Sequence, residues 1–451
     1  MQTVTETLAE FVASAVLSSV PSEAIERAKT CLLHNLGMAL AGRRAEPLAH
    51  RLVAKHYAHP GESTLFWDGS KVSAEGAVLA NAALMHARTQ DDTHFPASTH
   101  TGACVIPATL AMAEAEHATG EAFLLAMLLG YEVAARVGME YDTLSTARGF
   151  RATPIYGVFG AAAASAKLLS LASGPTAAAF AYAANLAGGL GQTWIEGTSE
   201  WRLQVGIAGR NGIFAARVAE AGASGARESL EGVAGFYKAF GGTLDHARSA
   251  LETLGKQWQV NEVTLKPYPV CAVHQSPVGM MIELANKHDL QPAAVEKIVL
   301  ELSPYEANYP GIDNLGPFAD QGGTLMSGQF CMALALIDRQ ATIDGLFRFD
   351  DAVLNDLTKR VSIVANESLA PLCSRLSILT KSGEDISAET IVDAQTHKFS
   401  FDQTAGLVRR LLPEMAIGQG DLERLIEVVR SIDQAPDVKA LLECMTSSVA
   451  S

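Results

Sequence analysis

Apolar positions repeat at helical spacing through most of the first 266 residues of the chain. One clear stripe follows Pro21-Ser22-Glu23 and ends at Gly42, with Ser22 as the expected N-cap. Its members recur every three or four positions: Ile25, Ala28, Leu32, Leu36 and Leu40. Because such positions share one face of a helix, this face is expected to lie in the core.

Three later helical segments, at 75–88, 157–170 and 176–187, are rich in alanine. The last of them contains the uncharged run AAAFAYAANLAGG, and a helix without charge is normally buried. We therefore expect these segments to be the central helices of a bundle. The run VGIAGRNGIFAARVA at 205–219 spaces its glycines three apart inside a helical pattern, which favours close helix packing over phosphate binding.

The pattern changes after Pro267-Tyr268-Pro269. A helix at 276–288 leads to Val295–Leu302, where apolar and polar residues alternate as in a strand. Further short elements are expected beyond it: strands at Val361–Ala365, Leu376–Leu379 and Thr390–Ala394, and helices near 326–338 and 350–359. Helical periodicity returns at 402–449.

These patterns predict a mainly α protein with two domains. A large all-helical bundle domain is formed by residues 1–266 plus 400–451, and a smaller α+β domain, residues 267–399, is inserted into it.

Composition narrows the class of protein. Of 451 residues, 48% are hydrophobic and 18% charged, which allows a large core, and the net charge of −15 argues against nucleic acid or an anionic membrane as partner. No run approaches the roughly 20 apolar residues that span a bilayer. The N-terminus carries Glu6 and Glu10 and no basic segment, unlike a signal peptide. Six cysteines without a C-x-x-C pair predict buried free thiols, so a cytoplasmic protein is expected.

Common cofactor and nucleophile motifs are missing from the sequence. There is no G-x-G-x-x-G after a strand, no Walker A, no G-x-S-x-G and no H-E-x-x-H. Nicotinamide, nucleoside triphosphate and acyl-serine chemistry therefore lose their usual support, and we expect no cofactor and no metal.

One segment between two apolar helices is dense in polar, titratable side chains. Within fifteen positions it holds His86, Asp91, Asp92, Thr93, His94 and His100. Residues 95–102 are expected to form a loop that leads into a helix starting near Val105. Polar groups at the entrance of a helix are placed to meet an anion. Capping and a solvated loop is the ordinary alternative, and a metal site from Asp92, His94 and His100 is a further one, although no fourth ligand is evident.

Three more segments carry cations next to buried helices or at the domain junction. Arg148, Arg151 and Tyr156 precede an alanine-rich helix, and Trp201 and Arg202 lie between two apolar helices, either as a stacked surface pair or as pocket residues. The planar fork of arginine suits carboxylate binding. Lys266 stands before two prolines at the junction, where desolvation would lower its pKa enough for it to act as a base.

These segments, in this order and spacing, resemble the MmgE/PrpD family over nearly the whole chain. The strings that carry the resemblance are DDTHFPASTHTGACVIPA (91–108), GYEVAARVG (130–138), ARGFRATPIYGVFGAAAASAKLL (147–169) and LKPYPVCAVH (265–274). Members include 2-methylcitrate dehydratase, cis-aconitate decarboxylase and iminodisuccinate epimerase. The resemblance implies a helical domain with an inserted α+β domain, a site between them, a small polycarboxylate substrate and a homodimer.

The family's site residues match this chain only in part. Thr93, His100 and Lys266 stand where dehydratase and decarboxylase members have threonine, histidine and lysine. The departures are Thr89 for an aspartate, Arg151 for a histidine, Trp201 for a lysine and Phe330 for a tyrosine. Dehydration needs an acid for the leaving hydroxyl, and arginine almost never serves as one.

The departures favour an epimerase that exchanges the proton α to a carboxylate. In this hypothesis Lys266 is one base, His100 or Tyr156 is the other, and Asp92 orients or tunes it. Carboxylates would be clamped by Arg148, Arg151 and Arg202. Two alternatives stay open: a dehydratase or decarboxylase of citrate-like acids, and a non-catalytic polycarboxylate-binding protein.

Overall fold

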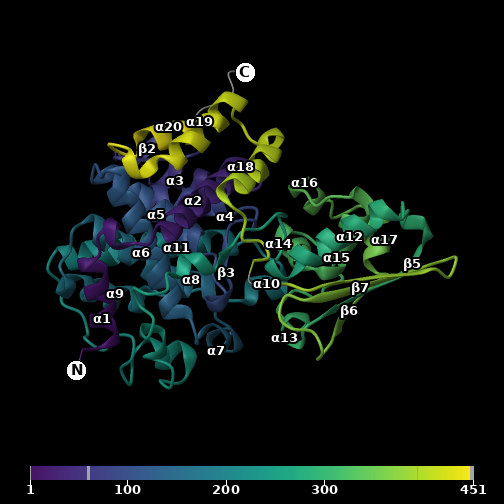
Figure 1. Cartoon of the computed structure of the whole chain (residues 1–451), viewed down its shortest axis with the longest axis horizontal. Helices are drawn as coiled ribbons and strands as arrows, with labels where there is room; N and C mark the ends of the chain where they lie inside the picture. Colours follow the sequence, from purple (N-terminus) through teal and green to yellow (C-terminus); the bar gives the residue numbers. More distant parts are fainter. Residues whose placement is uncertain (1, 58–60, 394, 447–451) are drawn as a thin grey trace.

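The computed structural model describes residues 2–57, 61–393 and 395–446 and places them in two packed units (Figure 1). The larger unit is helical. Its N-terminal helices are α1 Val4–Ser14, α2 Ser22–Gly42, α3 Leu48–His56, α4 Ala74–His86, α5 Thr101–Ala115, α6 Gly120–Gly138, α7 Asp142–Ala147, α8 Ala152–Leu168, α9 Ser173–Leu186, α10 Gln192–Glu196 and α11 Trp201–Glu220. The prediction of a mainly α protein is confirmed.

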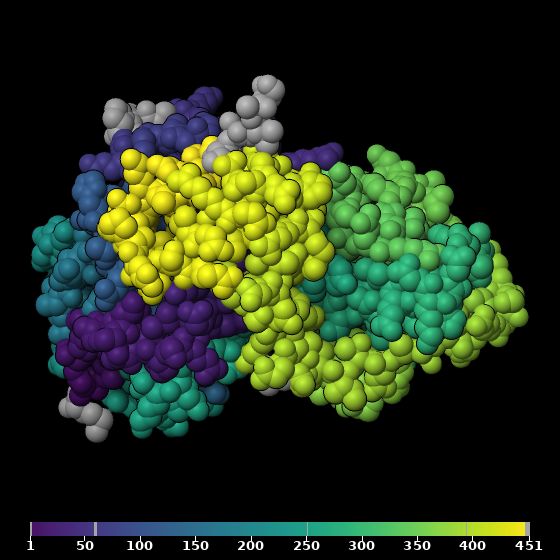
Figure 2. Space-filling view, turned by 45° about the horizontal axis from the view of Figure 1, so that its top comes forward, coloured from purple at the N-terminus to yellow at the C-terminus, as the bar shows by residue number. Residues whose placement is uncertain are grey.

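The C-terminal helices return to the larger unit. They are α18 Phe401–Arg410, α19 Gln419–Arg430 and α20 Lys439–Thr446. Their apolar side chains share one core with α1, α2, α5, α6 and α8. Figure 2 shows this segment, in yellow, lying over the N-terminal helices and against the green α+β unit.

The centre of the helical unit is built from α4, α5, α8 and α11. Two of the three alanine-rich segments, α4 and α8, are central as predicted, whereas the third, α9, is partly exposed, with Asn185 open to solvent. Small residues allow the helices to approach closely. A Cβ at Gly206 of α11 would lie 2.5 Å from the carbonyl oxygen of Leu79, and one at Gly212 would lie 2.5 Å from Ala161. The glycines of the 205–219 run therefore serve helix packing.

The smaller unit is a four-stranded sheet with helices against it. The strands are β5 Val295–Leu302, β6 Val361–Ala365, β7 Ser374–Thr380 and β8 Asp385–Thr390, in the order β6-β5-β7-β8. Only the β5–β6 pair is parallel. The helices are α12 Gln275–Lys287, α13 Pro304–Ala307, α14 Gln321–Met326, α15 Gly328–Asp338, α16 Ile343–Leu346 and α17 Ala352–Thr358, and of these α12, α15 and α17 lie along the sheet in Figure 1.

Two short ladders complete the fold within the described residues. β1 Ser63–Thr64 pairs with β2 Lys71–Val72, and β3 Thr93–His94 pairs antiparallel with β4 Val263–Thr264. The second ladder joins the polar segment after α4 to the stretch that leads into Lys266.

Three local predictions are wrong at element ends. Ser22 is the first helical residue and Pro21 occupies the N-cap. Helix α5 begins at Thr101, four residues before the predicted start near Val105. The last strand is Asp385–Thr390 rather than Thr390–Ala394, and Ala394 lies outside the described residues. All six cysteines are free thiols, five buried and Cys271 half-buried.

Two large cores follow the two units, with one exception that matters for the site. Trp194 and Trp201 come from the helical segment, yet they pack in the core of the α+β unit. The boundaries 1–266 plus 400–451 and 267–399 stay a prediction.

Candidate active site

A cavity of about 320 Å³ opens where the two units meet. The helical unit contributes Thr89, Thr93, Phe95, Ser98, His100, Asp142, Arg151, Ala152, Thr153 and Trp194. The α+β side contributes Cys271, Ala272, Val273, Tyr305, Glu306, Tyr309, Leu325, Met326, Pro371 and Leu372, with Lys266 at the junction. This volume falls in the range of small-molecule sites.

Lys266 is buried, and its ammonium donates a hydrogen bond to the carbonyl oxygen of Thr89. Burial lowers the pKa of Lys266, and the nearby Asp91 carboxylate acts in the opposite direction. Thr89 has a left-handed backbone, with φ of 48°, which is uncommon for a β-branched residue. An amine whose charged form is disfavoured by burial can exchange a proton with a ligand.

His100 lines the cavity, and the hydrogen bonds of its ring define which of its two nitrogens carries the proton. Its Nδ1 lies 2.9 Å from the carbonyl oxygen of Asp92 and 3.5 Å from the Asp91 carboxylate. Both partners are acceptors, so Nδ1 carries the proton and Nε2 keeps a lone pair. Burial, helped by Lys266, holds the pKa of His100 well below its usual range. His100 is thus a neutral base at neutral pH.

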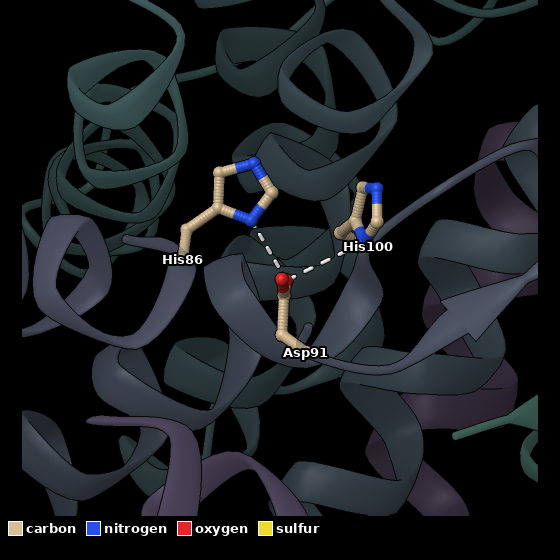
Figure 3. A group of neighbouring side chains, drawn as sticks. All are labelled: His86, Asp91 and His100. Carbon is tan, nitrogen blue, oxygen red and sulfur yellow. Dashed lines mark hydrogen bonds and ion pairs between the residues drawn. The ribbon is translucent and has the colours of Figure 1, made fainter. Parts of the chain in front are cut away.

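A second histidine, His86, packs next to His100 and has a hydrogen-bond partner at each of its two ring nitrogens. His86 Nδ1 lies 2.8 Å from Asp91 Oδ2, and His86 Nε2 accepts from Arg151 Nη2 at 2.6 Å. Figure 3 shows Asp91 between the two imidazoles, whose ring centres are 4.9 Å apart. Burial, then the charge of Arg151, holds the pKa of His86 well below its usual range. The result is a connected chain, Arg151–His86–Asp91–His100.

The described residues contain one group that could offer three metal ligands, namely His86, Asp91 and His100. Its ligand atoms lie within 4.8 Å of one another. Two cations oppose a metal there, because Arg151 is bonded to His86 and the charge of Lys266 reaches both histidines. The arrangement suits a hydrogen-bonded acid–base chain better than a metal centre.

The other metal set weighed from the sequence does not assemble. His94 Nε2 is paired with Gln259 at 3.2 Å. The Asp92 carboxylate accepts from the Tyr131 hydroxyl and from the Gly102 amide. Asp92 orients His100 through its backbone carbonyl, while its buried carboxylate anchors the start of α5.

Only one of the three expected arginine clamps reaches the cavity. Arg151 lines it and also donates to the Trp201 carbonyl and to Gln204. Arg202 is buried against Gln321, Glu46 and Asp320, away from the cavity lining. Arg148 is exposed and donates to the carbonyl of Ala239.

Three other candidates divide between the cavity and the core. Thr93 lines the cavity, and its buried hydroxyl has no hydrogen-bond partner within the described part of the chain. Trp201 is fully buried beneath His86, with ring centres 5.1 Å apart. The Tyr156 hydroxyl lies 2.9 Å from Ser145 and the residue is not part of the cavity lining. The structure therefore does not bring Tyr156 to a position where it could serve as the second base.

Sequence reasoning missed several cavity residues. Tyr305 and Tyr309, at α13 and just after it, are four residues apart. This spacing places two side chains on one face of a helix, so the sequence contained a signal for this pair. Asp91 lies behind the lining. It stands in the polar segment singled out from the sequence but has no predicted role, because two adjacent aspartates do not reveal which one faces the histidines. Glu306 lines the cavity, and burial raises its pKa although Ser303 and the Leu372 amide donate to it.

Comparison with known proteins agrees with this architecture. The MmgE/PrpD N-terminal domain matches residues 6–248 and the MmgE/PrpD C-terminal domain matches residues 268–410. The chain therefore belongs to the MmgE/PrpD family, and the curated relatives that it resembles include enzymes.

Two fungal relatives cover nearly the full length at low identity, and a human relative covers about half. A cis-aconitate decarboxylase-like protein, oryM, of Aspergillus oryzae is 27% identical over 99% of this chain and 98% of its own length. Cis-aconitate decarboxylase of Aspergillus terreus is 25% identical over 99% and 97%. The human cis-aconitate decarboxylase is 28% identical over 52% of this chain and 50% of its own length. Within the described residues, no helix is long and apolar enough to cross a bilayer.

Proposed function

We propose that this chain is a lyase that decarboxylates a small unsaturated carboxylic acid, with Lys266 and His100 as its proton-transfer groups. The observation that carries this proposal is the placement of the Lys266 ammonium and the free Nε2 of His100 in one cavity at the junction of the two units. The relatives reported above that span 99% of the chain are a cis-aconitate decarboxylase and a cis-aconitate decarboxylase-like protein, which supports this reaction class.

In the proposed reaction the bond between a carboxyl carbon and its neighbour breaks and carbon dioxide leaves. The electron pair left behind shifts through the double bond toward a second carboxylate and takes a proton to form a new C–H bond. Lys266 is positioned to hold that second carboxylate, and its lowered pKa also makes it a proton donor. The step consumes one proton and breaks no C–H bond, so His100 would relay the replacement proton, and the Asp91 carboxylate would stabilise its protonated form.

An epimerase is the second candidate, because the same two groups could remove and return a proton on opposite faces of a carbon acid. The departures at Thr89 and Arg151 remove groups that dehydration would use, and they leave proton exchange intact. One measurement separates the two candidates. In D2O, decarboxylation yields carbon dioxide together with one new C–D bond, whereas epimerisation yields C–D without carbon dioxide.

The test uses purified protein and a panel of unsaturated di- and tricarboxylic acids that includes cis-aconitate. Carbon dioxide release and deuterium incorporation are followed by NMR. Lys266→Met and His100→Gln should each lower turnover by about 10²–10⁴-fold. Lys287→Met, at an exposed lysine of α12, is the matched control and should not. Ligand binding with neither product nor exchange from any acid would instead identify a binding protein and refute catalysis.

We also propose a homodimer, which the family resemblance implies, and a cytoplasmic location, which the free cysteines predict. The exposed side chains Ile207 and Phe214 lie seven residues apart on α11, hence on one face, which supports a partner there. Light scattering on the wild type and on Phe214→Glu tests the dimer, and a monomeric wild type would refute it.

A further inference from the structure

Fixed charge on the cavity wall is balanced rather than strongly positive. Among the described residues that line it, the cations are Lys266 and Arg151 and the acids are Asp142 and Glu306. Arg202 and Arg148, which would have made the site strongly cationic, lie elsewhere. A ligand with three carboxylates would therefore place three negative charges beside two acids, with only two cations to meet them.

The donors that remain on those two cations are also few. Arg151 uses three of its N–H donors on Trp201, Gln204 and His86. Its guanidinium has five such donors, so two remain. Lys266 has three donors and spends one on Thr89. The supply of donors on the two cations suits one or two carboxylates. The unpaired hydroxyl of Thr93 and the hydroxyls of Tyr305 and Tyr309, which also line the cavity, add neutral donors.

Apart from these hydroxyls and the polar groups of Thr89, Ser98 and Thr153, most of the remaining wall is apolar and comes mainly from the α+β unit. Val273, Leu325, Met326 and Leu372 line this side, with Phe95 and Trp194 from the helical unit. Trp194 is covered on one face by the Arg151 guanidinium, whose carbon lies 4.9 Å from the ring centre. The cationic end and the apolar end of the cavity therefore adjoin. A buried apolar wall gains affinity only from an apolar ligand group, because a carboxylate placed there loses its hydration without a partner.

We propose that the substrate is a dicarboxylic acid that carries an aliphatic arm, with the carboxylates at Lys266 and Arg151 and the arm against Met326 and Val273. This inference rests on the proposed function, since it describes what the same site accepts. It replaces the polycarboxylate expected from the sequence with an amphiphilic acid.

Alkylmalonates are suitable probes, because they keep two carboxylates constant while one arm grows. Calorimetry on the full chain should show the Kd falling about fourfold for each methylene added from malonate to butylmalonate. Tricarballylate, a saturated tricarboxylate, should bind no more tightly than malonate. Equal affinity along the series, tightest binding of tricarballylate, or no binding by any of these acids would each overturn the inference.

Two variants on the apolar wall test where the arm lies. Met326→Gln keeps the side-chain length and should reduce the gain per methylene while leaving the malonate Kd within about twofold. Val273→Thr, at a half-buried position, is the milder second change if Met326→Gln does not fold. Leu379→Gln, on the exposed face of β7, is the control and should keep the full gain. A full gain in both wall variants would overturn the placement.

Failure of this inference and failure of the proposed reaction give different results. If malonate and butylmalonate bind equally while an acid of the panel still releases carbon dioxide, only the aliphatic arm is refuted. If no acid reacts or exchanges while the gain per methylene holds, the proposed reaction falls and the amphiphilic site stands.

Discussion

The carboxylate of Asp92 provides a direct test of whether this residue is structural. It is fully buried and accepts from Tyr131 and from the Gly102 amide at the start of α5. Burial raises the pKa of Asp92 from an ordinary 3.8 to about 6, and the neighbouring Asp91 adds to this while the Tyr131 hydrogen bond opposes it. The perturbation is Asp92→Asn, which removes the titration and keeps the shape.

The sign follows from proton linkage. A folded state with a raised pKa binds the proton more tightly than the unfolded chain, so the stability it provides is complete below pH 3.8 and is lost as the pH rises through about 6. A rise from 3.8 to about 6 corresponds to about 3 kcal/mol. The free energy of unfolding of the wild type minus that of Asp92→Asn should therefore fall by about 2 kcal/mol between pH 4 and pH 7, because the full value of about 3 kcal/mol is reached only below pH 3.8.

The assay is urea unfolding followed by far-UV circular dichroism at several pH values, with the two proteins side by side. Any fixed cost of the asparagine is independent of pH, so the pH dependence of the difference isolates the carboxylate. Asp351→Asn is a control of opposite sign. The Leu354 amide and Arg348 lower the pKa of Asp351, so its contribution is lost as the pH falls. A flat difference for Asp92→Asn, or one that rises with pH, would refute the reasoning.

Three further outcomes are expected. Gly157→Ala should destabilise the fold by about 1–3 kcal/mol in urea melts, because its Cβ would lie 2.5 Å from Cys104 Sγ, whereas Gly406→Ala, with open space, should gain about 0.5–1 kcal/mol. Arg202→Met should lower the free energy of unfolding by about 1–3 kcal/mol and leave KM unchanged, because Arg202 bonds Gln321 and does not line the cavity. Arg151→Met, at a residue of the cavity lining, should raise KM in steady-state kinetics. The acid limb of kcat/KM against pH should lie below 6.5, because burial and Lys266 lower the pKa of the base His100; a limb above 6.5 would contradict this role.

Periodicity predicted the elements well where packing follows the sequence locally. The bounds of strand Val295–Leu302 agree with the prediction, and its burial alternates from Ile298 to Leu302, whereas Glu296 and Lys297 are both exposed at a register irregularity near the start. The start of α5 could not be predicted, because its first turn is satisfied by Asp92, ten residues upstream of Gly102, instead of an adjacent cap. The last strand ends at Thr390 because its partner begins at Ser374 and offers nothing further to pair with.

The candidate site was likewise predicted in part, for the residues whose position follows from their own segment. Lys266, His100, Thr93 and Arg151 reach one cavity from three separate segments, as expected from the sequence. Arg202 does not, because its direction depends on Gln321, more than a hundred residues away. Side-chain direction after a helix or loop is set by tertiary partners, and residue type alone does not contain that information.

The ladder between β3 and β4 has a consequence for how such an enzyme can change. Thr93 pairs with Thr264, so the strand before Lys266 is fixed to the strand before His100 through backbone hydrogen bonds. The two residues proposed to transfer protons, Lys266 and His100, are therefore held at a fixed spacing by this ladder. The α+β unit contributes most of the apolar lining of the cavity. Mutations in the α+β unit can therefore change which substrates fit the cavity without changing the spacing of Lys266 and His100. Substrate selectivity can then diverge among relatives while the reaction type is kept.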